Sequence, residues 1–507
     1  MSLGLLVVAL WVAQSEADRE AELFGAEPIA TSTAAAPEAR DEAALFGSET
    51  STGTTEAERD AASLDGKSSM GRLSDAVQAN DDFLDLGGEL WLFGQAAFAR
   101  EGDLQNTAVS SPSFMDLYLD VRPTDRLRAY ARGRLSYDFT VAAGAVDFLG
   151  RPQSETSAAL DQLWLKFDLF RTVFVTAGKQ RIRWGSSRIW NPTDFLNLSF
   201  RDPFNFLDLR LGVPLLKLHL PVEALGWNFY AIAALEDAAN FKGVGGALRA
   251  ELTYETAELS LSMSGRKDAP FQLGADLSVG VWLFDLRAEF AMTHHSQQPK
   301  FVGRFDVLPQ RLADGSLTGL YQAFFPTRTS RYDDWVPQLV LGFDLNIPVF
   351  ENDTLIVSAE YLYNQFGYSD SNLLPILLLT QNFNPLYASQ QYLGLSVVAI
   401  GPGDYNNTTI VAFAATSLSD QSWFARLQYS VRVLTYLDVG LFGSLSFGKD
   451  GAFNVAINFP TPDPSGVQDA LAQLGVDTSG AGAATGLDQL SFAAPRLILG
   501  ATLNLRL

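Results

Sequence analysis

A group of basic side chains in the first half of the chain could bind anions. Its members are Arg128, Arg132, Arg134, Lys166, Lys179, Arg181 and Arg183. The guanidinium group of arginine pairs with carboxylate or phosphate through two parallel hydrogen bonds. If these residues share one face of neighbouring strands, they form a basic wall that attracts anions inside a pore. The chain as a whole has a formal net charge of −22, so this basic group is a local feature.

Catalytic and metal-binding chemistry finds little support in the residue types. The chain has 3 histidines, His219, His294 and His295, and no cysteine. None of the histidines belongs to a recognisable nucleophile motif. His294 and His295 are adjacent and would point to opposite faces of a strand. We therefore expect no enzymatic activity, no metal and no cofactor. The acidic balance also argues against a nucleic acid partner.

The residues around the basic group alternate between apolar and polar types, as in strands with lipid on one side and water on the other. Over residues 127–138, every second residue is apolar or small, and the residues between them include the arginines. The apolar or small set is Leu127, Ala129, Ala131, Gly133, Leu135 and Tyr137. No internal stretch supplies the ~18 consecutive apolar residues of a spanning helix, so any membrane span must be made of strands. The pattern predicts an all-β, transmembrane antiparallel β-barrel over residues 83–507.

Short turns and long connections alternate along the same region, which is typical of outer-membrane barrels. Short turns are expected at 122–126, 169–172, 221–225, 255–257, 283–285, 350–354, 401–406 and 433–435, and long segments at 184–214, 293–334, 365–390 and 448–495. The spacing predicts about eighteen strands, with both ends of the barrel chain in the periplasm of a diderm bacterium. Outer-membrane lipid, lipopolysaccharide and the barrel-assembly machinery are then expected partners.

The segment before the barrel has a different composition. Residues 1–17 resemble a signal peptide, with an apolar run over 3–12 and small residues Ser15 and Ala17 before the expected cleavage point, although no Lys or Arg precedes the run. Residues 18–82 are acidic and poor in large apolar residues, which predicts a disordered periplasmic arm. Within the arm a tripeptide occurs twice, as Leu23, Phe24 and Gly25 and as Leu45, Phe46 and Gly47. Such a pair could dock onto a periplasmic protein, or it could be low-complexity drift.

Two segments resemble a family of large, uncharacterised porin-like barrels related to alginate-export channels. The first runs over residues 178–185 (GKQRIRWG) and continues with Trp190, Asn191, Pro192, Thr193 and Asp194; the second is 360–364 (EYLYN) with Gly367 and Tyr368. The resemblance covers the barrel only. It implies an outer-membrane channel and does not fix a substrate.

These patterns together predict a channel that passes a polar or anionic solute across the outer membrane. The loop over 184–214, with Trp190, Asn191 and Asp194, is the expected constriction. The alternation does not decide whether the basic residues of 179–183 face lipid or the lumen. We place them in the lumen because a cation that faces lipid near the midplane costs ~2 to 4 kcal/mol. Elsewhere the lumen carries both positive and negative side chains, which could give an electric field across the pore. The alternative function is a periplasmic assembly or secretion scaffold that the barrel anchors.

Overall fold

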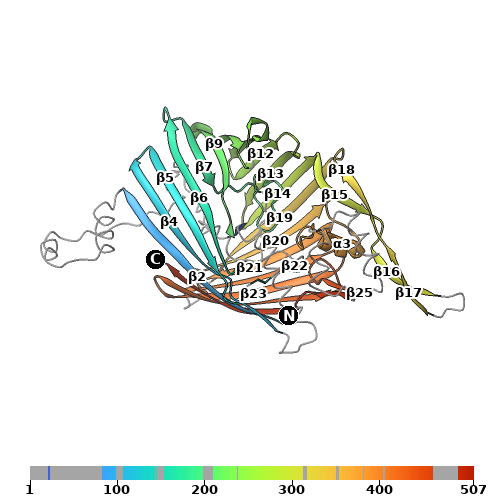
Figure 1. Ribbon diagram of the computed structural model, residues 1–507. Coiled ribbons are helices and arrows are strands. Elements are labelled where there is room, and N and C mark those ends of the chain that lie inside the picture. The colour runs from blue at the N-terminus through green and yellow to red at the C-terminus, as the bar shows by residue number, and fades with distance from the viewer. Residues whose placement is uncertain are drawn as a thin grey trace.

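The alternation of apolar and polar residues becomes the two faces of a closed sheet. In the computed structural model each barrel strand pairs with its neighbours in antiparallel fashion, and the first strand, β2 (Leu84–Phe98), also pairs with the last, β27 (Leu497–Arg506). The sheet therefore has no free edge (Figure 1). The barrel has 18 strands, so the predicted fold class and strand number are confirmed.

The structure describes residues 21–22, 83–98, 107–142, 144–145, 153–197, 209–236, 238–311, 317–349, 353–380, 382–402, 406–460 and 489–506. The predicted signal peptide lies outside these ranges. So do the predicted arm, except for β1 (Ala21–Glu22), and both copies of the Leu-Phe-Gly tripeptide.

The barrel strands follow one another around the wall in chain order. After β2 come β4 (Ser113–Thr124), β5 (Leu127–Tyr137), β6 (Thr156–Leu169), β7 (Val173–Gln180), β9 (Val213–Val222), β10 (Trp227–Ala234), β11 (Gly245–Tyr254), β12 (Ala257–Gly265), β13 (Phe271–Val281), β14 (Phe284–His294), β19 (Val336–Val349), β20 (Asp353–Asn364), β21 (Gln391–Ile400), β22 (Thr408–Ser417), β23 (Ser422–Leu434), β24 (Leu437–Gly448) and β27. The short β3 (Ala108–Ser110) pairs with β2 beyond the end of β4.

The remaining elements lie in the connections. They are the strands β8 (Leu209–Arg210), β15 (Ser296–Val302), β16 (Asp306–Arg311), β17 (Leu317–Phe324), β18 (Thr327–Arg331), β25 (Ala456–Pro460) and β26 (Gln489–Ala493), the 3-10 helices η4 (Glu223–Leu225), η5 (Phe241–Gly243) and η6 (Ser371–Leu373), and the helix α3 (Leu374–Leu379). The β16–β17 hairpin projects well away from the barrel (Figure 1). No helix within the described ranges is long and apolar enough to cross a bilayer.

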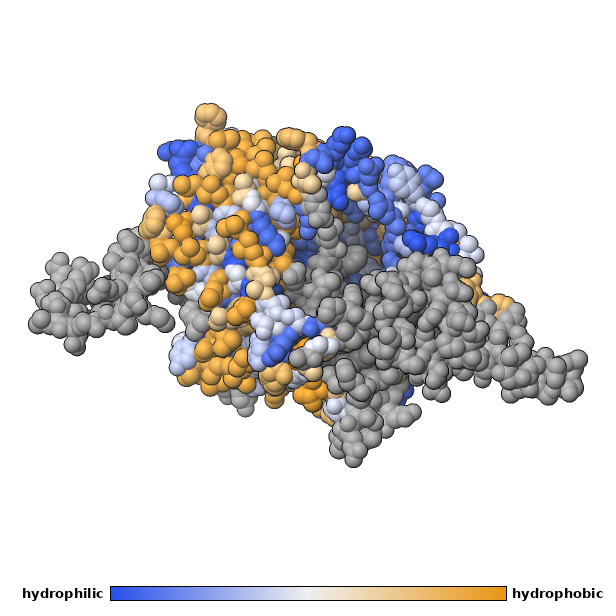
Figure 2. All heavy atoms as spheres, viewed as in Figure 1, coloured by the Kyte–Doolittle hydropathy of each residue, from blue (hydrophilic) through white to orange (hydrophobic). Residues whose placement is uncertain are grey.

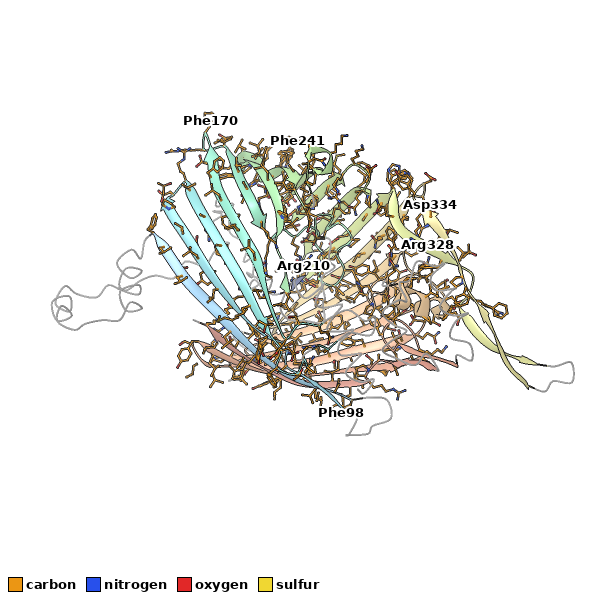
Figure 3. The ribbon with its side chains drawn as sticks, viewed as in Figure 1. Phe98, Phe170, Arg210, Phe241, Arg328 and Asp334 are labelled. Carbon is orange, nitrogen blue, oxygen red and sulfur yellow. The ribbon has the colours of Figure 1, made fainter. Side chains whose placement is uncertain are left out.

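Short turns gather at one end of the barrel and long connections at the other. Phe170 lies in the short β6–β7 turn and Phe98 ends β2 at the long-loop end, and Figure 3 shows them at opposite ends of the molecule. The expected short turns are confirmed to within a few residues by the strand bounds. In outer-membrane barrels the short turns are periplasmic, so the long connections face outward.

The outer face is apolar and the inner face is charged. On β5, Leu135 is 45% exposed, whereas its neighbour Arg134 is 6% exposed. Apolar side chains cover much of the visible outer surface of the barrel in Figure 2. An apolar exterior around a polar interior suits a wall with lipid outside and water inside. The chain is therefore a transmembrane β-barrel of the outer membrane.

Candidate pore and its constriction

The predicted basic wall lies on the inner face of β4 to β6, where aspartates pair with it. Arg134 Nε donates to Asp116 Oδ1 at 2.9 Å, and Arg132 Nη2 donates to Asp116 Oδ2 at 3.2 Å. Arg128 binds both carboxylate oxygens of Asp120, at 2.8 and 2.7 Å. The wall is thus a ladder of ion pairs in which carboxylates offset most of the positive charge.

A third aspartate, Asp161 on β6, ties the wall to the segment that follows β7. It is fully buried and accepts hydrogen bonds from Arg181 Nε and Nη2 at 3.2 and 2.8 Å. Arg132 Nε lies 3.7 Å from the same carboxylate. The backbone N–H of Gly212, just before β9, also contacts its side chain at 3.2 Å. Asp161 therefore holds both ends of the β7–β9 connection against the wall.

The other predicted wall residues have different positions. Lys166 is on the inner face of β6, with its Nζ 5.4 Å from the ring centroid of Phe174. Arg183 lies beyond the end of β7 and donates to the carbonyl oxygen of Ser187 at 2.9 Å. The prediction that Lys179 lines the pore is wrong, because Lys179 pairs with Leu163, which is 53% exposed on the outer face. Directly paired residues of antiparallel strands share a face.

The three aspartates of the ladder were not among the residues predicted from the sequence. Asp116 and Asp120 alternate with Leu117 and Leu119, so the parity rule that located the arginines would also have located them. Asp161 was harder to find, because a bulge in the β5–β6 pairing shifts the parity of β6 at this point. Such a bulge leaves one residue without a partner and changes the direction of its side chain.

Residues 181–197, here called the strap, leave the end of β7 and cross the lumen. The backbone N–H of Ser187 donates to Glu289 on β14, and the N–H groups of Arg188 and Ile189 donate to Glu360 on β20. Five strands, β9 to β13, separate β7 from β14 around the wall, and β20 lies nearly opposite β7. The strap therefore extends from one side of the barrel to the other.

Glu289 binds the strap on both sides of residues 188–190. Its Oε1 accepts from Ser187 N at 2.6 Å and from Asn191 Nδ2 at 3.3 Å, and its Oε2 accepts from Thr193 Oγ1 at 2.9 Å. A Cβ atom at Gly185 would lie 2.5 Å from Glu289 Oε1, and Gly185 has a φ of 95°. This close approach requires glycine, both for space and for its backbone conformation.

Glu360 binds the middle of the strap through three consecutive N–H groups. The distances are 2.5 Å from Arg188 N, 2.8 Å from Ile189 N and 3.3 Å from Trp190 N. The carboxylate is 1% exposed. Hydrogen bonds to a charged group contribute ~1.5 to 3 kcal/mol each. Arg188 Nε also donates to Asp344 on β19 at 2.9 Å, which adds an ion pair at the middle of the strap.

The predicted constriction residues are anchors of the strap. Trp190 is 0% exposed; its Nε1 donates to the carbonyl of Leu386 at 3.2 Å, and its ring centroid lies 5.8 Å from that of Tyr392. Asn191 bonds to Glu289. Asp194 accepts from Arg210 Nη1 at 2.7 Å, and Figure 3 shows Arg210 about halfway between the two ends of the barrel. The sequence pattern pointed to these three residues but not to the partners that hold them. Those partners are Glu360 for Trp190, Glu289 for Asn191 and Arg210 for Asp194.

Apolar side chains fill part of the lumen next to the strap. They come from the strap, from η6 and α3 in the β20–β21 connection, and from residues 452–455 after β24. On the wall they pack against β19 to β23, through Val340, Leu362, Tyr392, Phe413, Ala415 and Phe424. The ion-pair ladder of β4 to β6 lies on the other side of the barrel. This apolar plug thus occupies the side of the lumen opposite the ladder.

The three histidines make aromatic contacts. His294 lies 4.6 Å from the ring of Trp335, and His295 lies 4.6 Å from the ring of Tyr332. His219 Nε2 is 2.9 Å from Asn228 Oδ1. In the part of the chain that the structure describes, no group of three or more His, Asp or Glu side chains is arranged to hold a metal ion.

Comparison with known proteins finds similarity only among solved structures. No protein-family model and no curated protein matches the chain. OccK9 (OpdG) of Pseudomonas aeruginosa is 12% identical, with 84% of this chain and 98% of that chain covered and a TM-score of 0.45. The outer membrane protein OpdK of the same organism is 8% identical, with 83% and 99% covered and a TM-score of 0.44. A triple mutant of Rhodopseudomonas blastica porin is 10% identical, with 84% and 100% covered and a TM-score of 0.37.

The barrel assignment rests on the strand pairing of this chain itself. The resemblance of residues 178–185 and 360–364 to alginate-export channels stays a sequence-based prediction.

Proposed function

We propose that this chain is an outer-membrane channel that passes a small polar solute through a lumen narrowed by the strap. The observation that supports it best is the strap itself, a segment seated across a charged lumen by two buried carboxylates. Barrels of 16 to 18 strands are wide enough to leave an aqueous channel. A segment that crosses such a lumen narrows it and selects solutes by size and polarity.

The passage is expected on the side of the lumen that the ladder of β4 to β6 lines. The apolar plug packs on the opposite wall, and an apolar filling excludes water and ions. The ladder offers Arg128 and Arg181, each with a side chain 19% exposed, beside aspartates that are almost fully buried. A solute there meets hydrogen-bond donors and acceptors close together.

The ladder favours a polar solute over a strongly anionic one. Five arginines, Arg122, Arg128, Arg132, Arg134 and Arg181, pair with the three aspartates Asp116, Asp120 and Asp161, which leaves two positive charges in excess. Cations that already hold carboxylates at hydrogen-bond distance attract an anion less than free cations do. We therefore expect weak anion selectivity.

Solute flux into liposomes tests the proposal. The purified full chain is reconstituted into multilamellar liposomes, and swelling is followed with neutral and anionic solutes of graded size. We expect swelling with small neutral solutes, slightly faster swelling with small anions, and a sharp size limit. A variant that lacks residues 189–195 should raise the size limit. Liposomes with folded protein that swell no faster than protein-free liposomes would instead favour the scaffold, for which the arm repeat is the supporting sequence feature.

A further inference from the structure

Aromatic side chains form a band on the inner wall near the periplasmic end of the barrel. One stack joins Tyr118, Tyr130 and Trp164 on β4, β5 and β6, with ring centroids 6.1 and 5.4 Å apart. A second stack joins Phe174, His219 and Tyr230 on β7, β9 and β10, with centroids 5.9 and 4.6 Å apart. These residues, here called the aromatic band, occupy six consecutive strands of the barrel wall.

The strand register places the band inside the barrel. Tyr118 alternates with the exposed outer residues Leu117 and Leu119. Tyr130 pairs with Asp120 of the ladder and with Trp164. On the other stack, His219 pairs with both Phe174 and Tyr230. Phe174 has the parity of Gly178, which pairs with Trp164, so the second stack lies on the same face as the first. Because directly paired residues share a face, all six rings face the lumen.

The band lies on the periplasmic side of the strap. Tyr130 and Phe174 are near the starts of β5 and β7, immediately after short turns. The strap leaves β7 at its other end, after Gln180. A solute that has passed the strap therefore meets the band before it enters the periplasm, and one that leaves the periplasm meets it first.

Barrel stability does not account for the band. Apart from His219, its rings are only partly buried, and they face a lumen that is otherwise polar at this level. Leaving aromatic surface in contact with water forgoes the favourable free energy of burial. A ligand that covers the rings would recover this free energy.

Positively and negatively charged groups that can form hydrogen bonds border the rings. The guanidinium of Arg128 lies 5.5 Å from the ring centroid of Trp164 while it binds Asp120. The hydroxyl of Tyr230 donates to Glu251 at 3.1 Å. A strongly anionic ligand would meet Asp120 and Glu251, and a cationic ligand would meet Arg128 and Lys166. The surroundings therefore suit a neutral ligand that can both donate and accept hydrogen bonds.

We propose that the aromatic band is a binding site for a neutral sugar, which it holds on its way through the channel. This rests on the proposed channel function and adds a solute class to it. The C–H groups on one face of a sugar ring carry small positive charge and pack against the negative face of an aromatic ring. The hydroxyl groups at the edge of the sugar then reach the paired arginines and carboxylates. The two stacks offer sugar units two aromatic surfaces, with Lys166 between them at the junction of β6 and β7.

Sugar-induced block of the channel current tests this site. The purified full chain is inserted into a planar bilayer, and maltohexaose is added at millimolar concentration on the side of the short turns. We expect a concentration-dependent block of the current. Benzoate, a planar anion, and polyethylene glycol of similar size to the sugar are the comparison solutes, and they should block much less. Stronger block by benzoate than by maltohexaose would overturn the assignment to a neutral sugar.

Two substitutions and a matched control locate the site. Trp164→Ala and Tyr230→Ala each remove one ring of a stack, and we expect about a three- to tenfold rise in the half-blocking concentration of maltohexaose. Phe229→Ala is the control. It removes a ring on the outer face of β10, next to Tyr230, and should leave the block unchanged. Equal block in all variants would overturn the proposed site.

Calorimetric titration of the detergent-solubilised chain with maltohexaose gives a second readout that needs no current. If the chain conducts but neither assay detects the sugar, this inference fails and the channel function stands. If the chain does not conduct, the channel function fails, and the titration alone decides whether the band binds sugar.

Discussion

Replacement of Glu360 by glutamine should release the strap while leaving the barrel intact. Glutamine has nearly the same shape as glutamate but carries one oxygen and one amide nitrogen. In the wild type the two carboxylate oxygens accept from three backbone N–H groups of the strap, those of Arg188, Ile189 and Trp190. An amide cannot accept at both positions, so at least one N–H faces another donor.

The size of the effect follows from these contacts. If the glutamine oxygen stays with Ile189 and Trp190, the N–H of Arg188 loses a charge-assisted hydrogen bond at a buried site. That loss costs ~1.5 to 3 kcal/mol. Because each ~1.4 kcal/mol is a factor of ten in an equilibrium, the displaced state of the strap should become roughly ten- to a hundredfold more populated.

Single-channel recording in planar bilayers measures this change. We expect Glu360→Gln to show larger or noisier conductance steps than the wild type, with the mobility of a folded barrel on gels of unheated samples. Glu251→Gln is the matched control, because Glu251 is also a lumen carboxylate but binds Arg249 and Tyr230 rather than the strap. Identical conductance and noise in wild type and Glu360→Gln would refute the role of Glu360 as an anchor of the strap.

Three further experiments test other parts of the chain. Arg132→Glu should impair folding and lower anion permeability, because it would place a third carboxylate beside two buried aspartates. Refolding yield measures the first effect and reversal potential the second, and a normal refolding yield would contradict the ion-pair ladder. Leu135→Arg puts a cation on the lipid-facing surface and should make the free energy of insertion less favourable by ~2 to 4 kcal/mol if the residue lies near the midplane. Refolding into liposomes measures this, and unchanged insertion would contradict the outward position of Leu135. In the arm, Phe24→Ala with Phe46→Ala should abolish capture of a periplasmic protein by residues 18–82, whereas equal recovery by pull-down would identify the repeat as drift.

The barrel could be predicted from the sequence because its rule is local. A strand with lipid on one face and water on the other alternates residue by residue, as β5 does from Leu127 to Tyr137, and short turns mark where each strand ends. At β7 the charge of Lys179 was given more weight than this rule: Lys179 was placed inside although it shares its parity with Val175 and Ala177, which the rule would place outside. Desolvation of a cation near the end of a strand is less costly than it is at the midplane, so charge alone was a poor guide there.

The interior of the lumen could not be predicted because it depends on contacts distant in sequence. Glu289 and Glu360 are more than 90 residues from the strap residues that they bind, as the separations of 102 for Ser187 and 172 for Arg188 show. Each carboxylate sits on a strand whose alternation indicates only that it faces inward. Its partner is determined by the path of the strap across the barrel, and no periodicity in the sequence encodes that path.

Ion conductance of the full chain in planar bilayers, compared with that of a variant lacking residues 189–195, tests most directly whether the strap narrows an open channel. We expect discrete conductance steps with weak anion selectivity for the wild type, and larger steps for the deletion, because the strap crosses the lumen between Glu289 and Glu360. A correctly folded wild-type barrel that carries no current, or a deletion that conducts no better than the wild type, would contradict this expectation.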